Sequence, residues 1–152
     1  MKNPLRYQMT EYDCGPTSML NAVSYLFRRD EIPPELTRNI MLYCLDCFGE
    51  DGSTGRRGTS RMAMMFLSNW LNGYGETGHL AVSSRYLSGR EVNFSQNGPL
   101  RDALRRGGAA VVNYCISWWN LAREAGAPLL SVDATSGDLT RFLMVLLLLA
   151  AA

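Results

Sequence analysis

Cys14 is the residue whose type and position best suit chemistry. It stands before Gly15-Pro16 and an apolar pattern with helical spacing, which predicts a helix from about Pro16 to Phe27. Backbone N–H groups and the helix dipole favour negative charge at a helix N-terminus. The pKa of a cysteine thiol in such places falls from about 8.5 to about 3.5–7.5. We therefore expect a reactive thiol at Cys14; the alternative is a buried cysteine that serves as a small apolar side chain.

Gln8 lies six residues before Cys14. When a thiolate attacks a carbonyl group, the oxygen atom becomes an anion that needs hydrogen-bond donors. The side-chain amide of Gln8 and the backbone N–H of Cys14 are suitable donors. The two residues together predict a nucleophile with an oxyanion hole.

Two further cysteines, Cys44 and Cys47, form a CxxC motif. A structural zinc site needs four ligands, and Cys115 with His79 would complete a set. Both cysteines of the motif fall on the apolar stripe of a predicted helix, so we favour packing in the core. A redox role is weaker, because the motif comes late in its helix instead of opening it.

The length and composition indicate one globular domain, and we predict no cofactor for it. The 152 residues are 47% hydrophobic and 19% charged, and the net charge is +1. This balance gives no electrostatic basis for nucleic-acid binding. The single histidine excludes any site that needs two histidine ligands. The start of the chain has no apolar signal-peptide core, so the pattern favours a cytoplasmic protein with reduced thiols.

Three helices are predicted in the first half of the chain. The second begins at Pro34, and its apolar stripe runs through Cys44 to Cys47. The third is capped by Ser60, buries a face with Met62, Met65, Phe66 and Trp70, and ends at Gly73-Tyr74-Gly75. Between them, the glycine-rich stretch 49–58 is predicted to be a loop.

The second half is predicted to supply a small antiparallel sheet. A short strand is expected near 80–82, and a short helix is expected from Pro99 to about Gly107. A buried strand should follow over 109–119, then a loop over 120–140. From Phe142 to Ala152 every residue is apolar, in a run too short to span a bilayer, which needs about 20 residues.

The segment Gln8…Asp13-Cys14-Gly15-Pro16-Thr17 resembles the active-site motif of papain-like cysteine peptidases. It is most similar to the double-glycine peptidase-like branch, which includes the bacterial leader-cleaving domains of bacteriocin exporters. The resemblance covers about residues 5–75, and 100–112 is similar as well. It implies that Cys14 is the nucleophile of a thiol protease, that Gln8 is the oxyanion donor, and that the substrate is a peptide.

The back third departs from this family. The family's catalytic histidine follows a strand, but the corresponding residues 114–120 contain no histidine. His79 is the only candidate base, and an exposed loop histidine is the more common explanation for it. Asp133 lies near the position of the orienting acid. We therefore expect weak or absent peptidase activity, and a back third that is diverged, truncated or shifted in reading frame.

These observations predict a single α+β domain with a papain-like fold. Its parts are a helical half (1–75), a sheet half (76–140) and an apolar tail (141–152), with helices packed on an antiparallel sheet. If the back third does not belong to the fold, this sheet is incomplete at its C-terminal end. An incomplete sheet would leave an exposed strand edge and favour self-association. The alternatives are an inactive peptide-binding module, a small CxxC metal-binding protein, and a helical protein that attaches to membranes through the tail.

Overall fold

Three helices form in the first half of the chain, largely where the proline, glycine and serine residues predict them. In the computed structural model, residues 5–46, 51–53, 58–77, 80–89, 91–92, 98–113 and 144–150 are described. The helices are α1 (Cys14–Phe27), α2 (Pro34–Cys44) and α3 (Arg61–Glu76). The chain leaves α1 through Arg28, whose φ of 50° is left-handed. Ser60 caps α3 by accepting a hydrogen bond from the N–H of Ala63 at 3.0 Å.

The prediction for α3 is wrong in its end and in its buried face. Gly73 and Gly75 do not stop the helix, which continues to Glu76. The buried face consists of Ala63, Met64, Leu67, Ser68, Leu71 and Tyr74. Met62, Met65 and Phe66 are exposed instead. Both sets have helical spacing, so periodicity alone could not select the face that packs.

The antiparallel sheet has three strands, β1 (Val82–Leu87), β2 (Ala109–Asn113) and β3 (Met144–Ala150), in the order β1-β3-β2. Val82 pairs with Ala150 on one side of β3, and Asn113 pairs with Met144 on the other. A short helix, α4 (Pro99–Arg105), connects β1 to β2. The predicted strand over 109–119 is described as far as Asn113, and residues 114–143 lie outside the described residues.

The apolar run near the end of the chain is not an appendage. Seven of its residues form β3, the central strand of the sheet. A central strand with helices over both faces is apolar on both sides, so it reads as a continuous hydrophobic run. The prediction of a tail beyond the sheet is therefore wrong for Met144–Ala150.

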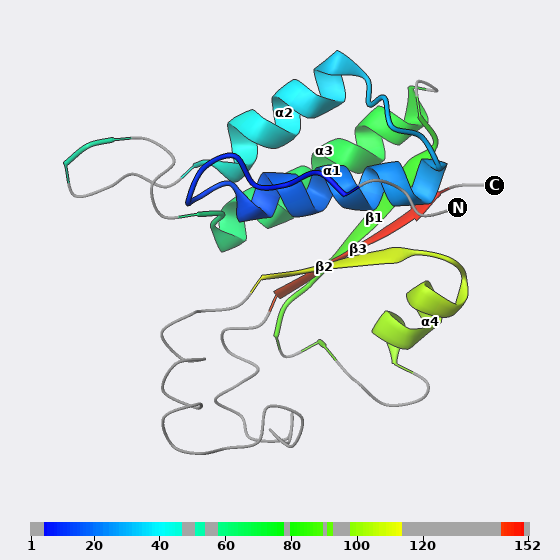
Figure 1. Ribbon diagram of the computed structural model, residues 1–152. Helices are drawn as coiled ribbons and strands as arrows, with labels where there is room; N and C mark the ends of the chain where they lie inside the picture. Colours follow the sequence, from blue (N-terminus) through cyan, green and yellow to red (C-terminus); the bar gives the residue numbers. More distant parts are fainter. Residues whose placement is uncertain are drawn as a thin grey trace.

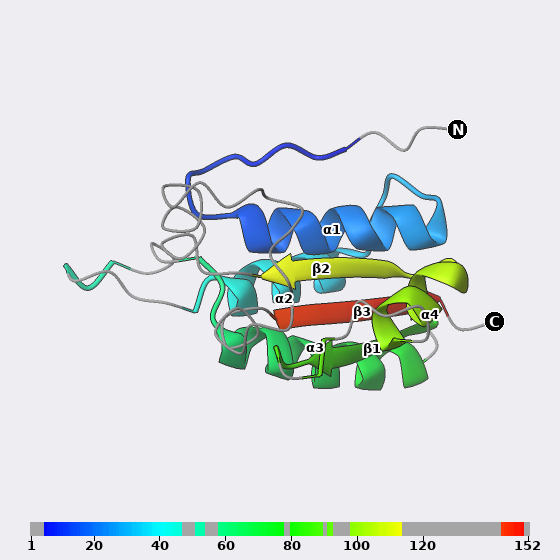
Figure 2. The same ribbon diagram turned by 90° about the horizontal axis from the view of Figure 1, so that it is seen from below.

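Helices cover both faces of the sheet (Figures 1 and 2). α1, α2 and α3 form a layer on one side, and α4 lies on the other. The main core lies beneath the three helices and includes Val23, Ile40, Leu67 and Leu71. A smaller cluster under α4 contains Leu87, Val92, Leu100 and Ala103. The chain is thus an α+β protein with helices packed on an antiparallel sheet, as predicted.

The three helices of the layer alternate in direction. Figure 1 shows α1 and α3 beginning at the left and ending at the right, while α2 runs the other way. The start of α1 therefore lies at the same end of the layer as the end of α2 and the start of α3. We call this the Cys14 end. The end of α1, the start of α2 and the end of α3 meet at the opposite end.

Candidate functional site

Cys14 is the first residue of α1, and its side chain is exposed. The predicted position at a helix N-terminus is confirmed. The first N–H groups of a helix have no partner within it, and no acidic residue lies in the first turn of α1. An accessible thiol therefore sits beside backbone groups that can donate hydrogen bonds to an anion.

The turn before Cys14 is built around Asp13. Its carboxylate is 3% exposed and accepts the N–H of Met9 at 2.9 Å and of Thr10 at 3.0 Å. Burial opposes ionisation of Asp13, but these backbone hydrogen bonds prevail and hold the pKa of its carboxyl below the usual range. The Asp13 carbonyl also accepts the N–H of Thr17 at 3.0 Å. Asp13 thus fixes the path by which the chain enters α1 at Cys14.

Gln8 lies in the same N-terminal segment and is exposed. Its Nε2 donates a hydrogen bond to the carbonyl oxygen of Glu11 at 2.9 Å. The amide is thus engaged within its own turn. To serve as an oxyanion donor, it would have to exchange this bond for one to the substrate.

The remaining candidate residues of the sequence are not placed. His79 and Asp133 lie outside the described residues, as do Cys47 and Cys115. The part of the chain that the structure describes contains no histidine. The prediction that one helix carries both cysteines of the CxxC motif is wrong, because α2 ends at Cys44, before Cys47.

Sequence reasoning missed the residues that tertiary packing brings to Cys14. A Cβ atom on Gly15 would lie 1.9 Å from Oγ1 of Thr59, so the backbone after Cys14 rests directly on that side chain. The Thr59 side chain also lies close enough to Cys44 to influence the pKa of its thiol. Asp46 accepts hydrogen bonds from both the N–H and the hydroxyl of Ser60. No local pattern connects these residues to Cys14.

Cys44, at the end of α2, is buried near Cys14, and its side chain is 1% exposed. Burial raises the pKa of its thiol to about 12. The Thr59 hydroxyl acts in the opposite direction, while negative charge at Asp46 and at Cys14 raises the pKa of Cys44 further. The structure therefore distinguishes an exposed Cys14 from a neighbouring Cys44 that stays protonated at neutral pH.

Several apolar side chains are exposed on α2 and α3. The rings of Tyr43 and Phe66 are in contact, with centroids 4.5 Å apart. Leu42, Met62 and Met65 are also exposed. These side chains lie on the helix halves that belong to the Cys14 end.

Among the described residues, no three acidic, histidine or cysteine side chains are grouped so that they could hold a metal ion. None of the described helices is long and apolar enough to cross a membrane.

We compared the chain with family models, with curated proteins and with solved structures, and no match was found in any of the three.

Proposed function

We propose that this protein is a cysteine peptidase-like domain that acts on peptides through the thiol of Cys14. The observation that carries the proposal is the exposed thiol at the first position of a 14-residue helix. The finer assignment to a papain-like fold of the double-glycine branch rests on the residues around Cys14 that resemble that family.

The geometry supports a nucleophilic role in three ways. The thiol is accessible to a substrate. The N–H groups of Cys14 and Gly15 at the start of α1 can donate to the negative charge that develops during acyl transfer. The Gln8 amide lies in the turn that leads to Cys14, where exchange of its bond to Glu11 would add a further donor.

The proposed step is attack of the Cys14 sulfur on a peptide carbonyl carbon. The C–S bond forms as the C–N bond breaks, and the leaving amine takes up a proton. Water then hydrolyses the thioester and restores the thiol. A general acid must supply the proton to the amine, and His79 remains the only histidine available for this role. Slow turnover is therefore expected.

The first test compares hydrolysis of fluorescently labelled casein by the full chain and by Cys14→Ala. We expect slow turnover that the substitution abolishes, because the nucleophile is lost. Tyr25→Ala is the control, since Tyr25 is exposed at the far end of the same helix. Its turnover should equal that of the unmodified protein.

Two further variants examine the supporting groups. Gln8→Ala should lower turnover by a factor of about 10²–10³ if its amide becomes an oxyanion donor. His79→Ala should lower it by about 10²–10⁴ if the imidazole transfers the proton. Turnover by Cys14→Ala, or no turnover by the unmodified protein under any condition, would contradict the peptidase proposal. Stoichiometric peptide binding without turnover would favour the peptide-binding module.

A further inference from the structure

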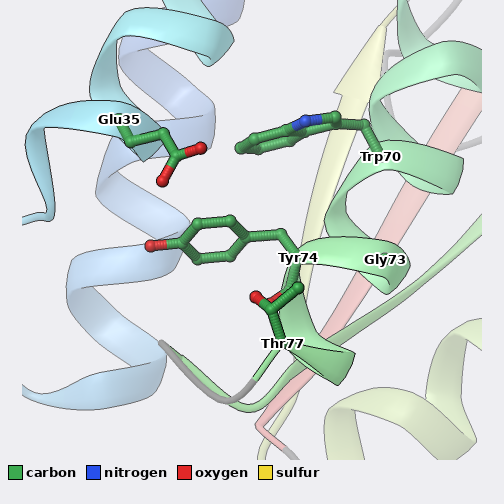
Figure 3. Close-up of a pocket in the computed structure, with 5 residues that line it drawn as sticks. All are labelled: Glu35, Trp70, Gly73, Tyr74 and Thr77. Carbon is green, nitrogen blue, oxygen red and sulfur yellow. The ribbon is translucent and has the colours of Figure 1, made fainter.

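A cavity of about 300 Å³ lies between α2 and α3 (Figure 3). It is at the end of the helical layer opposite the Cys14 end, where the start of α2 and the end of α3 lie (Figure 1). It is lined by Glu35, Trp70, Gly73, Tyr74 and Thr77. Glu35 comes from the first turn of α2, and the others come from the last turns and the C-cap of α3. Nothing in the proposed peptidase chemistry uses these residues.

One wall of the cavity is aromatic. The rings of Trp70 and Tyr74 are stacked, with centroids 5.2 Å apart and planes 28° from parallel. Trp70 is half-buried, while Tyr74 is only 7% exposed. Among the residues that the structure describes, none would come within 4 Å of a Cβ on Gly73, so no described side chain covers the surface beside the rings. The cavity thus presents a fixed aromatic surface to a ligand.

The opposite wall is negatively charged. Figure 3 shows the Glu35 carboxylate reaching from α2 toward the two rings. Of the five lining residues, Glu35 alone is charged. Burial and, to a smaller extent, the charge of Glu35 raise the pKa of the Tyr74 phenol, and the positive charge of Arg29 opposes that shift. The charges of Glu35 and Arg29 therefore both reach the Tyr74 side of the cavity.

The end of α3 adds to the negative potential. The last carbonyl groups of a helix carry a partial negative charge that favours cations. The last turn of α3 contains no basic residue to balance it. The Thr77 hydroxyl is used locally, donating to the Tyr74 carbonyl at 2.7 Å. A carboxylate, a helix C-terminus and two aromatic rings thus converge on one small cavity.

We propose that this cavity binds a compact organic cation, an ammonium or guanidinium group whose apolar part lies against Trp70 and Tyr74 while its charge faces Glu35. Aromatic rings attract such cations, especially when they are partly desolvated. A side-chain guanidinium or ammonium of a peptide and a free quaternary ammonium share this chemistry. The site goes beyond the proposed function and does not depend on Cys14.

The test titrates the full-length protein with choline and follows the indole N–H signals by NMR. The chain has three tryptophans, and Trp70→Leu identifies the signal of Trp70. The neutral isostere 3,3-dimethylbutan-1-ol has the same shape without the charge. We expect choline to bind at least fivefold more tightly than the isostere, and Glu35→Gln to remove that difference.

Control variants show whether a change in choline binding comes from this cavity or from any loss of charge or of an aromatic ring elsewhere on the protein. Glu11→Gln removes an exposed carboxylate at the Cys14 end, and Phe66→Leu removes an exposed ring from α3 outside the cavity. Both should bind choline normally, and so should Cys14→Ala. Arg29→Gln should bind more tightly, because a competing positive charge is removed.

Two amino-acid probes distinguish the sources of the cation. Tighter binding of Nα-acetyl-arginine amide or Nα-acetyl-lysine amide than of choline would assign a basic peptide side chain. Tighter binding of choline would assign a free quaternary ammonium. Equal binding of choline and its neutral isostere, or unchanged choline binding by Glu35→Gln, would overturn the proposal.

Discussion

At the scale of single residues, Cys44 shows how packing changes the chemistry of a side chain. It has the same functional group as Cys14, but burial raises the pKa of its thiol to about 12. Cys14 lies at an exposed helix start. At neutral pH an alkylating reagent should therefore modify Cys14 and spare Cys44 in the folded protein, because the reagent cannot reach Cys44 and its thiol is protonated.

The raised pKa of Cys44 also makes stability depend on pH. Below about pH 9 the thiol is protonated in both states, so it has no effect. Between about pH 9 and 12 the unfolded chain loses this proton while the folded chain keeps it. The free energy of unfolding should then fall with rising pH, by at most about 1.4 kcal/mol per pH unit from this group.

Urea unfolding at several pH values measures this effect. The comparison is with Cys44→Ala, in which the other alkaline groups titrate as before. The stability advantage of the unmodified protein over Cys44→Ala should shrink between about pH 9 and 11. Parallel pH profiles for the two proteins would show that Cys44 ionises as easily in the folded state as in the unfolded state.

At the scale of elements, the contact between α3 and β1 depends on the side chain of Asn72. Its Oδ1 accepts the N–H of Ser84 at 2.7 Å, and its Nδ2 donates to the Ser84 carbonyl at 3.1 Å. The Ser84 hydroxyl adds a bond to the carbonyl of Ser68 at 2.7 Å. The amide thus pairs with a backbone position of β1, an edge strand of the sheet.

Asn72→Ala should destabilise the protein by about 1–3 kcal/mol, because two partly buried backbone groups lose their partner. Asn69→Ala is the matched control, since Asn69 is exposed on the same helix. It should change stability by no more than about 0.5 kcal/mol. Urea unfolding of both variants gives the comparison, and equal stabilities would mean that water replaces the amide of Asn72 without cost.

Helix α3 and strand β1 also approach closely at Gly75. A Cβ atom there would lie 2.0 Å from the Val82 carbonyl oxygen. The glycine that was expected to end the helix is instead required by the strand that packs beside it. A local rule about glycine at helix ends therefore failed because tertiary contact set the requirement.

At the scale of the whole molecule, β3 joins the two edge strands. Leu146 pairs with Tyr86 of β1 and with Val111 of β2. A proline in a central strand removes a ladder hydrogen bond and is rarely tolerated. Leu146→Pro should therefore abolish cooperative unfolding, while Ala152→Pro, beyond the end of β3, should preserve it. Thermal unfolding followed by circular dichroism measures both, and a cooperative transition for Leu146→Pro would show that the sheet does not require β3.

Self-association remains a prediction at this scale. It followed from the expectation of an incomplete sheet with an open edge. The structure places β1 and β2 at the edges and covers part of β1 with Asn72. Sedimentation of the purified chain over a range of concentrations would test whether the edges bring chains together.

The sequence by itself determined where the helices begin and that Cys14 stands at one of these starts. Such features depend on residues that are neighbours in the chain: Pro16 in the first turn of α1, Pro34 at the start of α2, and Ser60 capping α3. Their effects are local, because each acts on the backbone within one helical turn.

Only the tertiary structure decided what surrounds these elements. The apolar run 142–152 fits a buried helix or a buried strand equally well by pattern, and pairing with β1 and β2 made Met144–Ala150 the central strand. Packing selected one of two apolar stripes on α3, and it brought Cys44 and Thr59 to Cys14. These outcomes depend on contacts between distant parts of the chain, where burial and hydrogen bonding outweigh local preference.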